Sequence, residues 1–156
     1  MRLALYQPDI PQNTGAILRL AACLGVPVDI IEPAGFDLSD RALKRAGLDY
    51  LAHVDLTRHA SWAAFEAWRA GAGSPRLVLL TAHGEAAYTA FAFAGDDVLL
   101  MGRESAGVPE KVRAAADALI KVPMREGMRS LNVAVAAAMV LGEALRQTAQ
   151  FPPGRP

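Results

Sequence analysis

The longest apolar pattern of the chain lies near its C-terminus, where every residue from 133 to 142 is apolar or glycine. A helix on the surface of a domain carries one apolar stripe and a charged back, so a helix of this composition has to be covered on several sides. The run is much shorter than the roughly 20 residues that cross a bilayer. The pattern predicts a helix packed within the core or between the core and a second subunit, and the small chain favours the second arrangement. We expect it to start near Ser130, whose hydroxyl can cap the first turn.

Shorter apolar runs alternate with helical patterns along the rest of the chain. Strands are predicted at residues 2–6, 28–31, 77–80, 98–101 and 119–122, with a weaker one at 51–56. Helices are predicted to end near residues 24, 46 and 70, and their expected caps are Asn13 or Thr14, Ser39 or Asp40, and Ser61. Pro109 can open a further short helix at its first position. The alternation predicts an α/β fold, in which helices cover both faces of a parallel sheet.

Three loops follow the ends of apolar strands, at residues 81–84, 102–107 and 123–129. The carboxyl ends of parallel strands meet at one edge of a sheet, where α/β proteins bind ligands. Glycines in these loops allow main-chain groups to approach a ligand closely. The sequence therefore predicts one binding site built from the three loops.

Composition limits the possible functions. The chain has 156 residues, of which 53% are hydrophobic, and its 16 basic and 16 acidic side chains give no net charge. We expect a single domain over residues 1–150, a loose tail at 151–156, and an RNA site only as a local basic patch. The one cysteine, Cys23, indicates a reducing compartment and is expected to be a buried structural thiol. Because the N-terminus has no signal-peptide run, a cytoplasmic protein is expected.

Several kinds of chemistry are disfavoured. No Gly-x-Gly-x-x-Gly follows a predicted strand, and no Gly-Lys-Ser/Thr motif is present. The three histidines have no metal-ligand spacing with one another or with Cys23, so we expect no metal. Ser105 resembles a hydrolase nucleophile, but Arg103 stands where that motif needs its first glycine.

Three stretches together resemble the SPOUT superfamily of RNA methyltransferases. They are PQNTG at 11–15 with Arg19, LMGRESAGVP at 100–109, and IKVPM at 120–124 followed by SLNV at 130–133. Two further stretches, IEP at 31–33 and RAGLDY at 45–50, are similar to the tRNA (cytidine/uridine-34) 2′-O-methyltransferases. The resemblance covers essentially the whole chain. Its departures are mild: Leu51 replaces a common tryptophan, and Val108 replaces leucine or isoleucine.

The resemblance implies a parallel sheet flanked by helices, with the C-terminal part threaded as a trefoil knot that binds S-adenosylmethionine and releases S-adenosylhomocysteine. The residues at the matching positions for the methyl donor are Leu80, Thr81, Gly102, Glu104, Val122, Met124, Ser130 and Leu131. Arg19 matches the arginine to which the family assigns a catalytic role, although its spacing alone is also typical of a solvated surface residue. A guanidinium is a poor base. We therefore expect Arg19 to clamp a phosphate that helps to take the proton.

The expected substrate is the wobble nucleotide in a tRNA anticodon stem-loop. Candidate substrate contacts are Asn13, Arg41, Lys44, Arg45, Arg125, Arg129 and Asn132. For Asn13 and Asn132 a purely capping role is an equal alternative. The resemblance also implies a homodimer through the knot region and the last helix, and no membrane contact. Two alternatives stay open: a ribose methylase for another tRNA or rRNA position, and a non-catalytic factor that binds the methyl donor and RNA.

Overall fold

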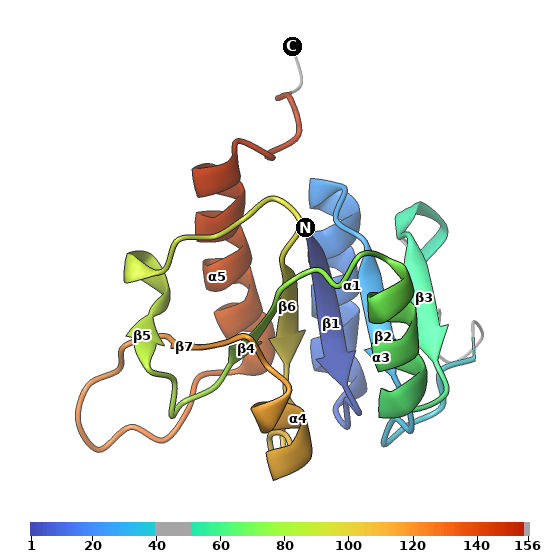
Figure 1. Cartoon of the computed structure of the whole chain (residues 1–156), viewed down its shortest axis with the longest axis horizontal. Helices are drawn as coiled ribbons and strands as arrows, with labels where there is room; N and C mark the ends of the chain where they lie inside the picture. Colours follow the sequence, from blue (N-terminus) through green and yellow to red (C-terminus); the bar gives the residue numbers. More distant parts are fainter. Residues whose placement is uncertain (40–50, 155–156) are drawn as a thin grey trace.

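The computed structural model describes residues 1–39 and 51–154. In these residues seven parallel strands form one sheet in the order β3-β2-β1-β6-β4-β7-β5 (Figure 1). The strands are β1 (Arg2–Tyr6), β2 (Val28–Ile31), β3 (Leu56–His59), β4 (Leu77–Leu80), β5 (Ala86–Ala87), β6 (Val98–Met101) and β7 (Ala118–Lys121). The parallel α/β architecture predicted from the sequence is confirmed, whereas the trefoil knot stays a prediction.

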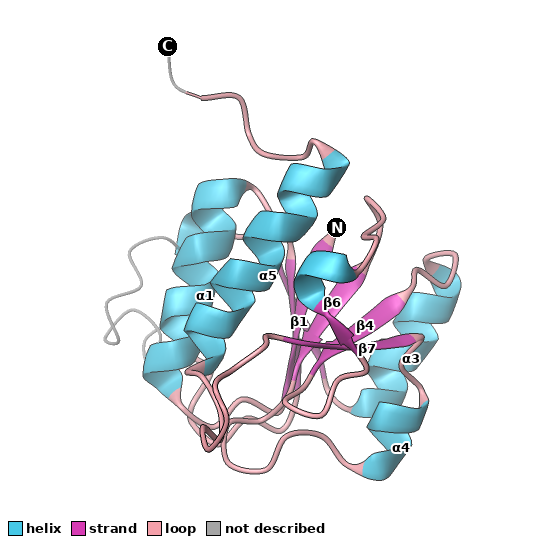
Figure 2. Cartoon of the chain, turned by 90° about the vertical axis from the view of Figure 1, so that its left-hand side faces the viewer, coloured by secondary structure: helices cyan, strands magenta, loops and turns pink. Residues whose placement is uncertain are grey.

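Helices cover both faces of the sheet, as Figure 2 shows: α1 and α5 pack side by side on one face, and α3 and α4 lie on the other. Their bounds are α1 (Pro11–Leu24), α3 (Trp62–Gly71), α4 (Glu110–Ala114) and α5 (Val133–Thr148), with short 3-10 turns η1 (Leu51–His53) and η2 (Tyr88–Ala90). The helix predicted at 39–46 lies outside the described residues. None of the described helices is long and apolar enough to span a bilayer.

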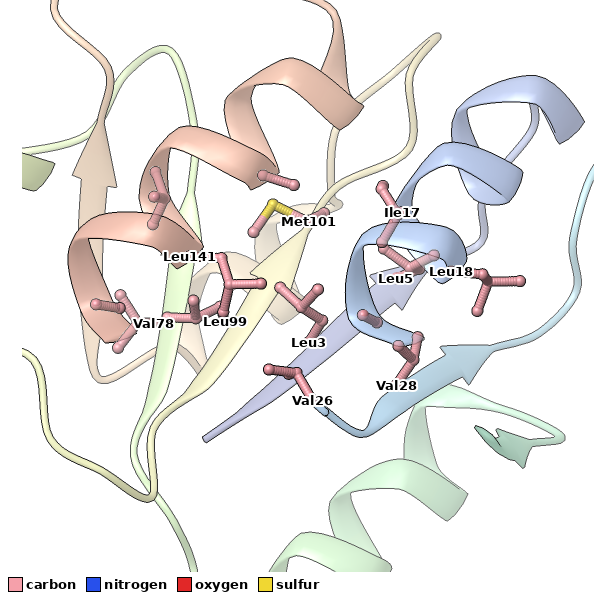
Figure 3. Packing of buried hydrophobic residues seen from close by; sticks show 14 of the residues in the cluster. Leu3, Leu5, Ile17, Leu18, Val26, Val28, Val78, Leu99, Met101 and Leu141 are labelled. Atoms are coloured by element: carbon pink, nitrogen blue, oxygen red, sulfur yellow. The ribbon is translucent and has the colours of Figure 1, made fainter. Parts of the chain in front are cut away.

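Alternate residues of each strand enter two separate cores, because successive side chains of a strand point to opposite faces. Under α1 and α5 the strands contribute Leu3, Leu5, Leu99 and Met101, all essentially inaccessible to solvent (Figure 3). On the other face the buried side chains include Ala4, Tyr6, Phe65, Leu77, Leu79 and Leu100. Burial on both faces explains why these strands have continuous apolar sequences.

The observed strand boundaries show where the apolar pattern alone predicts a strand correctly. Residues 28–31, 77–80 and 98–101 form strands as predicted, and β7 begins one residue earlier than expected. The strand predicted at 51–56 is wrong, since Leu51–His53 is a 3-10 turn and the strand runs from Leu56 to His59. A polar strand of this kind depends on partners across the sheet.

Those partners form a buried ion cluster on the α3 face. Asp29, which is fully buried within β2, accepts hydrogen bonds from Arg2 Nε at 2.7 Å and pairs with His59 Nε2 at 2.8 Å. The guanidinium of Arg2 lies 4.9 Å from the Trp68 ring centroid. A buried carboxylate needs such partners, since an unpaired one costs several kcal/mol. The cluster explains why Asp29 and His59 occupy otherwise apolar surroundings.

Several predicted helix ends are corrected by the structure. Helix α1 begins at Pro11 and Ile10 precedes it without a side-chain cap, so neither Asn13 nor Thr14 caps it; proline is well suited to a first turn because it lacks an N–H. Gly25 ends α1 in the left-handed conformation as predicted, with φ 66°. Pro109 stands at the cap position before α4 instead of inside it.

For α3 the predicted cap is confirmed, and for α5 the predicted cap is wrong. Ser61 caps α3 by accepting from Ala64 N at 3.1 Å, as predicted. Helix α5 begins at Val133 and is capped by Asn132, two residues after the predicted cap, Ser130. Cys23, expected to be buried, is exposed on α1.

Candidate active site

A cavity of about 600 Å³ opens at the carboxyl edge of the sheet. The three loops predicted to meet there do line it, together with the starts of α1 and α5. Its lining includes Ile10, Asn13, Leu80, Thr81, Ala82, His83, Gly102, Arg103, Glu104, Gly107, Val108, Arg113, Val122, Met124, Ser130, Leu131, Asn132 and Val133. This volume is typical of small-molecule sites.

Close contacts between backbones hold the loops in place. The loop after β6 folds back on itself, because Arg103 N–H donates to Gly107 O at 3.0 Å and Gly107 N–H donates to Arg103 O at 2.7 Å. Gly107 has a φ of +66°, and a Cβ at Gly102 would lie 3.0 Å from the Gly107 backbone. Glycine at both positions permits this tight return.

The loop after β4 is fixed against the end of β7 in the same way. Thr81 N–H donates to Ile120 O at 2.9 Å, and Glu85 N–H donates to Leu119 O at 2.9 Å. A Cβ at Gly84 would lie 2.3 Å from the carbonyl carbon of Ile120, so only glycine fits between them. Two walls of the cavity are therefore held together by main-chain groups.

The cavity has an apolar part and a polar end. Leu80, Val122 and Leu131 supply apolar surface from three different segments, and this surface suits a planar ring. All eight residues predicted to bind the methyl donor line the cavity: Leu80, Thr81, Gly102, Glu104, Val122, Met124, Ser130 and Leu131. Their role in binding it stays a prediction.

A chain of side-chain hydrogen bonds forms the polar end. Asn132 Nδ2 donates to Asn13 Oδ1 at 2.8 Å, and Asn13 Nδ2 donates to Glu104 Oε1 at 3.2 Å. Glu104 Oε2 also accepts from the backbone N–H of Asp9 at 3.0 Å. At its other end, Asn132 Oδ1 accepts from Ala134 N at 2.9 Å and so caps α5. The chain of bonds ties both helix starts to the one acidic side chain of the described cavity lining.

Asp9 lies directly behind Glu104. Its carboxylate accepts from the hydroxyl of Ser105 and lies 3.4 Å from Arg103 Nε. Burial and the adjacent Asp9 carboxyl raise the pKa of Glu104, whereas the hydrogen bond from Glu104, aided by Ser105, lowers the pKa of Asp9. The pKa values of the two carboxyls are thus shifted in opposite directions, as in pairs that share a proton.

Not every predicted residue reaches the cavity. Arg19 is exposed on α1, and Arg125 and Arg129 are exposed on the loop before α5; none of the three lines the cavity. The predicted contacts Arg41, Lys44 and Arg45 lie outside the described residues. Sequence reasoning missed Asp9, which follows β1 in a loop with no recognised motif.

Two further residues of the cavity were also missed. His83 lies in the predicted loop 81–84 but was not selected as a contact, and Arg113 lies on α4, outside the predicted loops. Only the tertiary fold shows that both side chains line the cavity. The structure describes no group of three or more His, Cys, Asp or Glu side chains that could hold a metal ion.

The parallel sheet, whose loops after β4, β6 and β7 line the cavity, shares its fold with a class of methyltransferases of known structure. The chain belongs to the SpoU rRNA Methylase family, whose model matches residues 1–142. Among individual relatives, a tRNA (cytidine(34)-2′-O)-methyltransferase from Beijerinckia indica is 66% identical over 145 residues, which are 93% of this chain and 90% of the relative. A protein of the same name from Escherichia coli K12 is 41% identical over 150 residues, 94% of this chain and 93% of the relative.

Solved structures agree with these relatives. A structure concerned with 2′-OH methylation of C/U34 on tRNA matches with a TM-score of 0.86 and 49% identity, over 94% of both chains. The SpoU methyltransferase AviRb from Streptomyces viridochromogenes, in complex with S-adenosylmethionine, matches with a TM-score of 0.84 and 32% identity, over 94% of this chain and 60% of that one. The similarity therefore extends to a family member solved with the methyl donor.

Proposed function

We propose that this protein transfers a methyl group from S-adenosylmethionine to the ribose 2′-hydroxyl of the wobble nucleotide, cytidine or uridine 34, of tRNA. The observation that carries the proposal is the cavity formed by the three loops, in a chain whose full-length relatives bear the name of this activity. Transfer needs the hydroxyl in line with the sulfonium methyl group, so positioning supplies much of the acceleration.

The cavity lining fits the methyl donor. Leu80, Val122 and Leu131 offer an apolar slot for the adenine, and the turn at Gly102 leaves main-chain groups accessible. Glu104 offers a negative group at the polar end, where the cationic part of the donor would lie. When bound, the donor supplies the electrophilic methyl group, and the residues of this chain hold it and exclude water.

Arg19 lies on the same helix as Asn13, one and a half turns further along, and we assign it to the RNA side of the site. A guanidinium binds a phosphate through two parallel hydrogen bonds, which lysine cannot reproduce. Arg19→Lys is therefore expected to lose most turnover while keeping donor affinity. A variant with full activity would exclude the bidentate clamp.

The RNA surface is proposed to include Arg125 and Arg129 on the exposed loop before α5, together with Arg41, Lys44 and Arg45. Contacts to phosphates make affinity fall as salt is added. Binding of an anticodon stem-loop should therefore weaken steeply with salt, and each charge-removing substitution should flatten the slope. A flat salt response would count against this surface.

The functional unit is proposed to be a homodimer. Helix α5 buries one side in the core but leaves Val135 (51% exposed) and Met139 (38% exposed) uncovered, and the segment before the helix exposes Leu131 and Met128. A second copy placed there would cover this apolar surface and enlarge the area available to RNA. Met139→Glu is expected to give monomers in sedimentation experiments, and an unchanged mass would argue for another interface.

The decisive experiment incubates the protein with labelled S-adenosylmethionine and tRNA transcripts. Label in a transcript with C or U at position 34, lost when that ribose is 2′-deoxy, is the expected result. Label that persists in the deoxy transcript would indicate another position. Donor binding without any RNA labelling would favour a non-catalytic binding factor.

A further inference from the structure

Glu104 and Asp9 form an unusual pair at the polar end of the cavity. Glu104 is the one acidic side chain among the described lining residues, and Asp9 stands behind it with a side chain only 17% exposed. Asp9 Oδ1 is buried and has no donor among the described residues when both carboxyls are ionised. Glu104 Oε2 accepts from the Asp9 backbone N–H at 3.0 Å, so the two residues are direct neighbours, and a proton held between their carboxyls would lessen the repulsion between them.

The surroundings favour one proton for the two groups. Two carboxylates in contact cannot both ionise without strong repulsion, and burial adds to the cost at Glu104. On the other side, Ser105 and Arg103 stabilise a charge on Asp9. A proton shared between the two carboxyls would leave the pair with a single negative charge when the cavity holds no cation.

On the basis of the proposed function, we propose that Asp9 and Glu104 share one proton and act as a pair. The pair adjusts the charge of the cavity to the charge of the bound ligand. The pair releases its proton when the sulfonium of S-adenosylmethionine enters. It takes a proton back when the neutral thioether of S-adenosylhomocysteine is left. Asp9 is a positioning residue in this scheme, because it acts through Glu104.

The transfer step balances with the pair as the proton acceptor. The ribose O–H bond breaks and an O–C bond to the methyl group forms. The C–S bond breaks, with its electron pair staying on sulfur, and an O–H bond forms on the carboxyl pair. Sulfur loses its positive charge as the pair loses one negative charge, so the net charge of the cavity is unchanged during transfer. Such matching avoids leaving an uncompensated charge in a partly buried site.

The other groups near the pair do not replace it in this role. Arg103 is the cation in contact with Asp9. The amide of Asn13, which donates to Glu104 from α1, and the amide of Asn132, which donates to Asn13, carry no charge. His83 and Arg113 are the remaining titratable or charged groups of the described lining. A charge on His83 would act on a bound cation in the same cavity independently of the pair. A variant is therefore needed to separate its effect from that of the pair.

The test measures proton release on binding by calorimetry, in buffers of different ionisation enthalpy, across the mildly acidic to neutral range. S-adenosylmethionine, and an analogue with a protonated amine in place of the sulfonium, are expected to release up to about one proton each. Below the pKa of the pair their Kd should rise about tenfold for each pH unit. S-adenosylhomocysteine should show neither effect.

Variants assign the proton to the pair. Asp9→Asn and Glu104→Gln each leave one carboxyl and a hydrogen-bonding amide, so both should fold and bind without proton release. Asp9→Glu keeps two carboxyls at this place and should therefore keep the proton release. Glu143→Gln makes the same chemical change in the ion pair with Arg146 at the far end of α5 and should release protons like the wild type. His83→Gln should also keep the release.

Three results would overturn the proposal: no proton release by the wild type, equal release with the thioether, or unchanged release in both Asp9→Asn and Glu104→Gln. A protein that binds the donor and methylates tRNA without proton release would refute the carboxyl pair alone. A protein that neither binds the donor nor labels tRNA would refute the proposed function.

Discussion

Asn132 joins two roles that a pair of substitutions can separate. Its Oδ1 accepts from the first-turn N–H groups of Ala134 and Val135 at 2.9 and 3.3 Å, and its Nδ2 donates to Asn13 at 2.8 Å. Asn132→Ala removes all of these bonds. Asn132→Asp keeps the cap and removes only the donor, because a carboxylate accepts but does not donate.

The expected losses of stability follow from these bonds. Loss of an asparagine cap costs about 1 kcal/mol, and the bond to Asn13 contributes about 1 kcal/mol more. Asn132→Ala should therefore lower the free energy of unfolding by about 2 kcal/mol, or the Tm by roughly 4–8 °C for a chain of this size. Asn132→Asp should stay within about 1 kcal/mol of the wild type, since a negative charge at a helix N-terminus is itself favourable.

Turnover should not follow the stability of the two variants. Both variants release Asn13, which otherwise holds Glu104, so both should lose turnover by about tenfold, the equivalent of roughly 1.4 kcal/mol. Thermal unfolding and tRNA methylation measured on the same preparations test this. Ser61→Ala is the matched control, because it removes the α3 cap far from the cavity and should cost about 1 kcal/mol without changing turnover.

Two outcomes would refute the reasoning about Asn132. If Asn132→Asp destabilised the protein as much as Asn132→Ala, the assignment of its oxygen as the α5 cap would be wrong. If Asn132→Asp methylated tRNA at the wild-type rate, the hydrogen bond to Asn13 would have no part in the reaction.

Three further outcomes are expected. Asp29→Asn should lower the free energy of unfolding by about 3–5 kcal/mol in urea titrations, whereas Glu32→Gln, in an exposed pair, should cost less than about 1 kcal/mol; equal losses would contradict the buried cluster. Gly84→Ala should cost about 3 kcal/mol or more, while Gly71→Ala, with open space around it, should change stability by less than about 1 kcal/mol. Because the pKa of Glu104 is raised, kcat/KM for tRNA should fall as pH drops through it, and a profile unchanged by Glu104→Gln would exclude this carboxyl as the titrating group.

The parts of the fold that were predictable from sequence are those set by local pattern. Val28–Ile31, Leu77–Leu80 and Val98–Met101 are buried on both faces, so their composition alone marks them as strands. Leu56–His59 escaped prediction because the burial of His59 depends on Asp29, thirty residues earlier. A contact of that kind leaves no trace in a short window of sequence.

The candidate site likewise has features that local sequence predicts and features that depend on long-range contacts. The meeting of three loops follows from strand polarity, and motif resemblance selected residues that do line the cavity, such as Gly102 and Ser130. Asp9 could not be selected in this way, because its importance comes from contact with Glu104, ninety-five positions away. Arg19 was selected by motif, yet it lies outside the cavity lining, so the RNA contact proposed for it stays a prediction.

The order of the strands also sets the order in which the chain can be assembled on the ribosome. β6 sits between β1 and β4, and β7 sits between β4 and β5, so each enters a gap between segments translated before it. Until residue 101 has left the exit tunnel, β1 and β4 both expose an open apolar edge, which is prone to aggregation. A translational stall before that point should therefore leave a nascent protein that depends on chaperones, whereas the first three strands can pair as soon as they emerge.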